Sequence, residues 1–409
     1  MTNMSDIRKM EYRKVTAEEK LHVSRLQNMV FSGGDNENDV REKIAKGEYK
    51  YDNTYAAIDE NGQVIAGMEI IPYTMWFDGH KVPMYGIGGV ASAPEYRRQG
   101  NVRGIFNKIF EDIYEQGAVF SHLYPFSYDY YRKFGYEHCG AAKRYTLPLE
   151  PARKLKNNGS AHEFIKSDIS GVRNKLIEIY ELYASRHNLM ISRSEDQWNG
   201  VFNIGLFGKN RLYYWENADH IIKSWIKFSK KDERMDIHDI AWTDNEGMLG
   251  ILQFMGMFEG AAEKLHFWTS GASPEFIAEL YWNELYEVKT ENQWMGMSRI
   301  VNVKRALELM KKPEGEGRFV IKVDDDFAEW NSNTYSVEYS GGECIVTVGN
   351  INKDINIDIE TTERALVLMI LGVYELDQIA HRNDVRINGN MQALKKIFRM
   401  KNLLLADHF

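Results

Sequence analysis

Apolar residues recur with a helical period along residues 101–117. Residues spaced three or four positions apart would share one face of an α-helix, and here they are Val102, Ile105, Phe106, Ile109, Phe110 and Ile113. Gly117 stands where a residue in the left-handed conformation commonly ends a helix. The pattern predicts a helix that packs on a core through one face.

Short apolar runs before this helix predict antiparallel strands. Asn61-Gly62 and Asp78-Gly79 each separate two runs of β-branched and aromatic residues, and these dipeptides are strong hairpin signals. A further strand is expected at Met10–Val15, before a capping-box-like helix start at Thr16. Ala118–Tyr124 reads as a strand after the helix. A meander followed by strand, helix and strand predicts a mixed α/β domain.

The pattern breaks around Leu147–Pro151, and two further blocks follow. In the second block we expect helices at Val172–Ser185 and Pro274–Glu287, with strands at Arg211–Asn217, His220–Phe228, Arg234–Trp242 and Leu249–Met257. In the third we expect strands at Gly317–Val323, Tyr335–Tyr339, Glu343–Val348 and Ile355–Ile359, a helix from Thr361 to Leu371, and an amphipathic segment at Asn390–Phe398. We interpret Asp324-Asp325-Asp326 as a solvated turn. The predicted domains are residues 1–150, 151–300 and 301–409.

Candidate chemistry is concentrated between the second hairpin and the helix. A glycine-rich strand ends at Ser92, Pro94 marks a turn, and Arg97, Arg98 and Gly100 lead into the helix. The first N–H groups of a helix lack internal partners and carry a partial positive charge, so two arginines beside them make an anion site suited to a pyrophosphate. A solvated turn is the alternative interpretation. The dinucleotide fingerprint does not fit, because the glycines lie inside the strand, at Gly86, Gly88 and Gly89.

The segment resembles the acetyl-CoA pyrophosphate loop of the GNAT acetyltransferases, and most of all that of the Eis (enhanced intracellular survival) subfamily. The matching residues are Val90, Pro94, Arg97, Arg98, Gly100 and Arg103. Val102 departs from the small residue of the wider GNAT pattern, and Gln99 replaces a frequent third arginine. The resemblance implies that acetyl-CoA is bound by Val90, Ala91, Ser92, Arg97, Arg98, Gln99, Gly100, Asn101, Val102, Arg103, Phe126 and Ser127.

An aromatic segment, Pro125–Tyr136, resembles the family motif that carries the general acid. The resemblance places this role on Tyr131, and Phe126 and Ser127 match positions whose backbone meets the acetyl group. Tyr130 replaces the usual aliphatic neighbour. Chemistry alone leaves Tyr128 and Tyr130 open as the working phenol.

The sequence ends in an apolar run, Leu403–Leu405, and a final aromatic residue. Members of the resembled family end in an aromatic residue whose free carboxylate acts as the base, which places that role on Phe409. The second block lacks a pyrophosphate loop, as expected for a degenerate second GNAT fold that binds no acetyl-CoA. The third resembles the sterol-carrier-like fold. The fold class implied is two tandem GNAT folds followed by a sterol-carrier-protein-like α/β domain, and the family implies a homohexamer.

Composition excludes several classes of function. With 44% apolar and 27% charged residues the chain is an ordinary globular protein, and a net charge of −8 argues against nucleic acid or an anionic membrane as partner. Two cysteines give no disulfide framework, which fits a cytoplasmic location. No apolar run approaches the roughly 18 residues of a membrane span. The histidines show no metal-ligand spacing, so we expect no metal.

The sequence therefore favours an acetyl-CoA-dependent N-acetyltransferase. The resemblance implies a small-molecule amine substrate, a polycation of the aminoglycoside type, and the acidic chain is compatible with one. A protein lysine acetyltransferase is an alternative. A second alternative is a non-catalytic acyl-CoA- or lipid-binding protein that uses its C-terminal domain.

Overall fold

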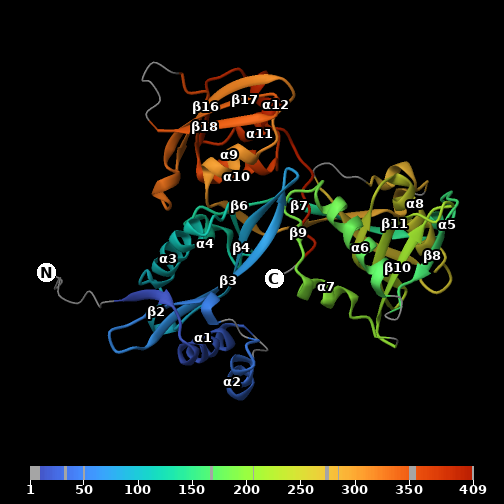
Figure 1. Cartoon of the computed structure of the whole chain (residues 1–409), viewed down its shortest axis with the longest axis horizontal. Coiled ribbons are helices and arrows are strands. Elements are labelled where there is room, and N and C mark those ends of the chain that lie inside the picture. Colours follow the sequence, from blue (N-terminus) through green and yellow to red (C-terminus); the bar gives the residue numbers. More distant parts are fainter. Residues whose placement is uncertain are drawn as a thin grey trace.

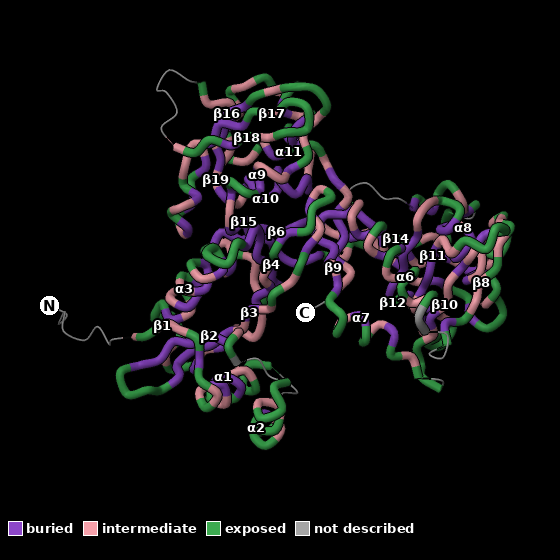
Figure 2. The backbone as a smooth tube through the Cα atoms, in the orientation of Figure 1, coloured by how far each residue is buried: buried purple, intermediate pink, exposed green. Residues whose placement is uncertain are grey.

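The computed structural model describes residues 10–31, 35–48, 51–165, 169–205, 207–271, 276–283, 285–349 and 356–407. Its chain forms three lobes, each built on a β-sheet (Figure 1). Buried residues fill the interior of the lobes and continue into the region where the lobes meet (Figure 2). The mixed α/β class predicted from the sequence is confirmed.

The first sheet has the strand order β1-β2-β3-β4-β5-β15-β6, with β9 paired to β3. Its strands are β1 (Glu11–Lys14), β2 (Thr54–Ile58), β3 (Val64–Phe77), β4 (His80–Ser92), β5 (Phe120–Leu123), β6 (Glu137–His138), β9 (Ile191–Ser192) and β15 (Met297–Ile300). Both predicted hairpins are present, as β2–β3 and β3–β4.

Helices cover both faces of the first sheet because side chains alternate along its strands. In β2, Tyr55 and Ala57 pack in one cluster with the apolar face of α3 (Asn101–Glu115), as the helical period predicts. Ala56 and Ile58 face the other way, toward Val23 of α1 (Ala17–Val30). The capping box at Thr16 is confirmed. The acidic segment at residues 33–39 is described only from Asp35, and its end forms the first turn of α2 (Glu37–Ala45).

The second sheet has the order β14-β7-β13-β12-β11-β10-β8. Its strands are β7 (Ala141–Pro148), β8 (Ser160–Glu163), β10 (Asn210–Glu216), β11 (Ile222–Lys231), β12 (Arg234–Trp242), β13 (Lys264–Thr269) and β14 (Lys289–Trp294). Its helices are α5 (Leu149–Arg153), α6 (Ile169–Ala184), α7 (Glu195–Phe202) and α8 (Asn245–Gly256). The first two sheets exchange strands: β7 leaves the N-terminal block for the second sheet, and β15 returns to the first sheet.

Two predictions for this block were wrong. Leu249–Met257 lies in α8 and just after it, not in a strand: Asp244 caps the helix, and its buried face repeats with a helical period at Met248, Ile251, Leu252 and Met255. The helix expected at Pro274–Glu287 is absent from the described residues 276–283 and 285–287, which hold short 3₁₀ turns at Ala278–Leu280 and Leu285–Glu287. There the buried Trp282 donates its indole N–H to Pro148 O (2.9 Å), which ties the segment to β7.

The third sheet has the order β18-β17-β16-β19-β20. Its strands are β16 (Glu316–Asp324), β17 (Asn333–Ser340), β18 (Glu343–Val348), β19 (Ile359–Thr362) and β20 (Val385–Ile387), and its helices are α9 (Val303–Leu309), α10 (Glu363–Leu371), α11 (Leu376–Ile379) and α12 (Met391–Ile397). α10 is the core of this lobe, because its residues from Ala365 to Leu371 are all buried. Residue 355, where a strand was expected to begin, lies outside the described residues, and β19 begins at Ile359.

A buried ion pair joins the first and third lobes. The Arg299 guanidinium of β15 donates to both carboxylate oxygens of Asp325 (2.9 and 2.7 Å) and to Phe134 O (2.6 Å). The interpretation of Asp324–Asp326 as a solvated turn was therefore wrong for Asp325, which is 3% exposed. Burial also raises the pKa of the neighbouring Glu363 carboxyl from 4.5 to about 7, with the Asp325 charge adding to the effect and Arg299 and Arg364 opposing it.

This shift predicts a pH dependence of stability. Folded Glu363 holds its proton at pH values where the unfolded chain has lost it, so the free energy of unfolding should fall as pH rises from about 4.5 to 7, by up to about 3 kcal/mol. Urea denaturation of the wild type and of Glu363→Gln at several pH values tests this: the substitution should remove that part of the slope. The exposed Glu338→Gln is the control. Parallel pH profiles for the wild type and Glu363→Gln would contradict the prediction.

Candidate active site

The C-terminal end of β4 is not paired with β5, its neighbour in the sheet. β4 pairs in parallel with β5 only at Met84, Tyr85 and Gly86, while its later residues up to Ser92 pair with β3 alone. The backbone edge of Val90, Ala91 and Ser92 therefore faces the gap that opens between the two strands. An extended chain that presents hydrogen-bonding groups can pair with such an edge.

A β-bulge bends β4 just before this edge. The register with β3 shifts between Gly67 and Glu69, so that Gly89 and Val90 both lie opposite Met68. Gly89 has φ of 60°, a conformation that suits glycine, and a Cβ there would overlap the Gln27 side chain. Gln27 donates its amide N–H to Gly89 O (3.0 Å) and to the Glu69 carboxylate (2.9 Å). The helix α1 thus holds the bulge in place.

The arginine loop follows and leads into α3. Arg98 has φ of 63° and Gly100 has φ of 84°, while Arg97 between Pro94 and Arg98 is extended. A non-glycine residue at positive φ is uncommon and frequently marks a functional segment. Gly100 is the N-cap of α3 and supplies no side-chain cap, so the first N–H groups of this 15-residue helix stay available to an anion.

The other loop residues also have defined places. Arg97, Arg98, Gln99 and Gly100 are exposed, and Gln99 donates its side-chain N–H to Glu95 O (3.3 Å). Asn101 is buried and donates to Tyr96 O (3.3 Å), which closes the turn. Val102 packs at the edge of the α3 core cluster. These residues lie together where the sequence predicted an anion site.

Arg103 points away from the loop. Its guanidinium donates to Lys133 O (3.3 Å) and lies over the ring of Phe327, 5.3 Å from its centroid. It therefore links α3 to α4 (Tyr128–Arg132) and to the third lobe, a contact that the motif alone does not indicate.

The predicted general acid lies on α4. Ser127 caps this helix through Tyr130 N (3.3 Å), and Phe126 before it is 73% exposed. Tyr131 is only 4% exposed, and its ring packs edge-on against Phe126 (5.4 Å between centroids) and Tyr130 (5.2 Å). Burial raises the pKa of the Tyr131 hydroxyl, with a smaller contribution from Tyr130, so the phenol is protonated at neutral pH.

The neighbouring tyrosines differ from Tyr131 in burial. Tyr128 and Tyr130 are half-buried, and burial raises the pKa of each hydroxyl. Tyr128 also lies under the Arg132 guanidinium, 6.0 Å from its ring centroid. Tyr131 is the most deeply buried phenol of the three.

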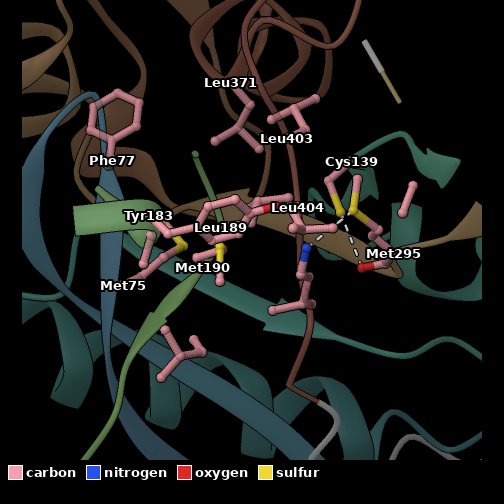
Figure 3. Packing of buried hydrophobic residues seen from close by; sticks show 14 of the residues in the cluster. Met75, Phe77, Cys139, Tyr183, Leu189, Met190, Met295, Leu371, Leu403 and Leu404 are labelled. Carbon is pink, nitrogen blue, oxygen red and sulfur yellow. Dashed lines mark hydrogen bonds between the residues drawn. The ribbon is translucent and has the colours of Figure 1, made fainter. Parts of the chain in front are cut away.

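The C-terminal segment returns to the first lobe. Leu403 and Leu404 pack against Leu189 and Cys139 near Met295 (Figure 3). Asn188 holds the segment through backbone hydrogen bonds with Asn402 O (2.8 Å) and Leu404 N (3.1 Å). The tail is thus a packed element rather than a free end. His408 and Phe409, where the resemblance places the base, lie outside the described residues.

Asp407 lies close to the segment that leads into α4. The Tyr124 hydroxyl, three residues before Ser127, donates to Asp407 O (3.4 Å). The Asp407 carboxylate accepts from Arg193 Nε (3.0 Å) and from the Tyr180 hydroxyl (3.2 Å). Burial, with a contribution from Asp407, raises the pKa of Tyr73 to about 12. The segment that precedes Phe409 therefore lies beside the strand that leads into α4.

Sequence reasoning missed Arg193, the residue that anchors this segment. Besides Asp407 it donates to the buried Asp239 (2.5 Å), and its guanidinium lies 4.1 Å from the Tyr180 ring centroid. The two carboxylates are 46 and 214 residues away in sequence, so no local pattern relates them to Arg193.

Among the described residues, no group of three or more histidine, cysteine or acidic side chains is arranged to hold a metal ion. In the same part of the chain, no helix combines the length and apolar character needed to cross a membrane.

Two family models match the sequence. Residues 11–139 match the family described as acetyltransferase (GNAT) domain, and residues 303–403 match the sterol carrier protein domain. No curated protein matches the chain.

Solved structures share the fold over nearly the whole chain. A GCN5-related N-acetyltransferase from Anabaena variabilis has a TM-score of 0.79 at 22% identity, covering 98% of this chain and 100% of its own. A probable N-acyltransferase from Enterococcus faecalis has a TM-score of 0.78 at 19% identity, and the match covers 97% of each chain. Eis1 from Mycobacterium abscessus has a TM-score of 0.76 at 16% identity, and the match covers 98% of this chain and 100% of its own.

The fold and the family match agree on the class of the N-terminal part: the chain contains an acetyltransferase (GNAT) domain. It carries in addition a C-terminal sterol carrier protein domain.

The Arg193 cluster yields a stability prediction. Arg193→Met leaves the Asp239 carboxylate buried without its cation, which should lower the free energy of unfolding by about 3–5 kcal/mol. Hydrogen exchange at the Leu404 amide should also become faster, because the tail loses its anchor. Arg211→Met is the matched control, since that side chain is 36% exposed and 3.7 Å from its acidic partner. Wild-type stability in Arg193→Met would show that the cluster does not hold the tail.

Proposed function

We propose that the protein transfers the acetyl group of acetyl-CoA to an amino group of a polycationic small molecule. The open edge of β4 beside an exposed arginine loop at the start of α3 carries this proposal, because the pair suits a ligand with an extended amide arm and a diphosphate. The pantetheine arm would lie along Val90–Ser92 and the pyrophosphate at Arg97–Gly100. Phe126 and Ser127 would border the acetyl group.

The proposed reaction needs three proton transfers. The substrate ammonium loses a proton to become a nucleophile, and the Phe409 carboxylate, directly or through water, takes it. The amine then attacks the thioester carbonyl carbon. As negative charge develops on the carbonyl oxygen, that oxygen accepts hydrogen bonds from N–H groups of the β4 edge. The C–S bond breaks, and the leaving thiolate takes a proton from Tyr131. The nitrogen of the new amide then loses its extra proton, which restores the Tyr131 phenol.

Burial acts on both partners of the second transfer. A phenol has an ordinary pKa near 10 and a thiol one near 8.5, so the transfer is uphill by about 2 kcal/mol in water. The environment that raises the pKa of Tyr131 also disfavours a free thiolate at the same place. The two shifts oppose each other, so the raised pKa of Tyr131 is compatible with its role as acid.

The substrate is proposed from charge and resemblance. A net charge of −8 attracts polycations, and the resemblance to the Eis subfamily favours an aminoglycoside-type amine. The carboxylates of Asp239 and Asp407 are held by Arg193 and are not assigned to substrate binding. A thiol-release assay with acetyl-CoA against aminoglycosides, polyamines and a lysine-containing peptide decides among these amines. No release with any amine would contradict the proposal. The homohexamer and the cytoplasmic location remain predictions.

Tyr131→Phe removes the proposed proton donor and keeps the ring packing. Because general-acid catalysis is typically worth about 10² to 10⁴ in rate, kcat should fall by at least about 10² while the Kd of acetyl-CoA changes little. Stopped-flow kinetics and calorimetric titration measure the two. Tyr130→Phe is the matched control. Wild-type kcat in Tyr131→Phe, or a larger loss in Tyr130→Phe, would remove Tyr131 from the role.

Extending the chain beyond Phe409 tests the base. A Gly-Ser extension moves the terminal carboxylate, so turnover should fall by about 10² at neutral pH, with acetyl-CoA binding intact. The same extension placed before Met1 should have no effect. Full activity with the C-terminal extension would rule out the carboxylate of Phe409. Retained acetyl-CoA binding with no turnover even in the unmodified protein would favour the non-catalytic alternative.

A further inference from the structure

An open pocket of about 430 Å³ lies between the GNAT domain and the sterol carrier protein domain. Its walls come from the first turn of α3, from α4 and the residue after it, from the segment that follows β16, and from the start of α10. The lining residues that bear on ligand chemistry are Arg103, Arg132, Lys133, Phe327, Glu363 and Arg364. A cavity of this volume is in the range that holds small-molecule groups.

Two cations in this pocket, one from each domain, are left without strong acidic partners. Within the described part of the chain no carboxylate forms an ion pair with Lys133, and the carboxylate nearest to Arg364 is Asp384, at 3.9 Å. By contrast Arg132 is occupied by Glu137 (2.8 Å) and Asp129 (3.1 Å). Arg103 lies over Phe327.

The acidic groups of the pocket do not cancel these cations. Asp129 is held by Arg132, and Asp326 is exposed to solvent. Glu363 is buried, which raises the pKa of its carboxyl to about 7, so near neutral pH it carries less than a full negative charge. The pocket therefore keeps an excess of positive charge at Lys133 and Arg364.

The pocket touches the first turn of α3, the helix into which the arginine loop leads. Arg103 follows Gly100 by three residues, about 4.5 Å along the helix axis. α3 and α4 are in contact there, since the rings of Phe106 and Phe134 stack with centroids 4.3 Å apart. In coenzyme A the diphosphate is joined to C5′ of a ribose that carries a phosphate on C3′. A diphosphate at the loop would leave that second phosphate only a few bonds away, within reach of a pocket at the first turn of α3.

We propose that the pocket binds the ribose 3′-phosphate of acetyl-CoA, with Lys133 and Arg364 as its donors. The proposal rests on the proposed function, because it takes acetyl-CoA as the ligand of the loop. It gives the sterol carrier protein domain a part in cofactor binding: Arg364, at the start of α10, contacts the nucleotide end of a molecule whose thioester end lies near Tyr131.

Calorimetric titration with coenzyme A and 3′-dephospho-coenzyme A tests this without turnover. The wild type should bind coenzyme A about tenfold more tightly than the dephospho compound, the size expected for charge-assisted hydrogen bonds to one phosphate. Lys133→Gln and Arg364→Gln should each reduce this ratio about threefold and leave the Kd of the dephospho compound unchanged. Arg386→Gln, in the same domain and 74% exposed, is the matched control and should keep the ratio.

Other outcomes overturn the proposal in distinguishable ways. A wild-type ratio near one, or a ratio that neither variant changes, rejects the 3′-phosphate assignment and leaves the proposed function standing. Failure of the wild type to bind either compound rejects acetyl-CoA as the donor and the assignment with it. Excess inorganic phosphate should weaken the binding of coenzyme A more than that of the dephospho compound. Phosphate that protects Lys133 from acylation while the ratio is near one would identify the pocket as a site for free phosphate instead.

Discussion

The arrangement of the GNAT and sterol carrier protein domains depends on the ion pair between Arg299 and Asp325. Both side chains are completely buried. Removing either partner would leave a charge without compensation in the interior, so the pair restricts how these domains can sit. Arg299 also donates to Phe134 O, beside Gly135. Gly135 has φ of 80°, and a Cβ there would overlap the Arg299 guanidinium, so this position requires glycine.

This pair connects the domain interface to the candidate active site. Phe134 and Gly135 directly follow α4, the helix of Tyr131, and Phe134 stacks on Phe106 of α3. On the other side of the pair, Asp325 accepts from Phe327 N (3.0 Å), and the Phe327 ring lies under Arg103. The positions of the proposed acid and of the first turn of α3 therefore depend on contacts from the third lobe. The second lobe also contributes to the candidate active site, because its Arg193 forms an ion pair with Asp407 of the C-terminal segment.

Local signals in the sequence were sufficient to predict an element wherever residues close in sequence determine its structure. The apolar period of α3, the two hairpin dipeptides and the capping box at Thr16 all predicted what is present. The strand prediction for Leu249–Met257 was wrong because a short, mostly apolar run fits a buried helix equally well. Asp325 looked like part of a polar turn, since its partner Arg299 is 26 residues away.

The residues of the candidate site also fall into those that a local motif indicates and those that it does not. Its loop, its bulge glycine and Tyr131 follow one another within a single stretch, so a motif could indicate them. The parts contributed by distant segments carried no such signal: Gln27 against Gly89, Arg103 against Phe327, and Arg193 against Asp407. These contacts depend on tertiary packing, within one lobe for Gln27 and between lobes for Arg103 and Arg193, which no spacing in the sequence indicates.

The exchange of strands between the first two sheets has a consequence for the order of assembly. β15 lies between β5 and β6, although it follows them by roughly 174 and 159 residues in sequence. During synthesis on the ribosome, β5 has no partner on that side until residue 300 has emerged and the second lobe has been made. An unpaired strand edge invites pairing with other chains. A nascent chain halted in the middle lobe would expose this edge, and the N-terminal lobe cannot mature ahead of the one that follows it.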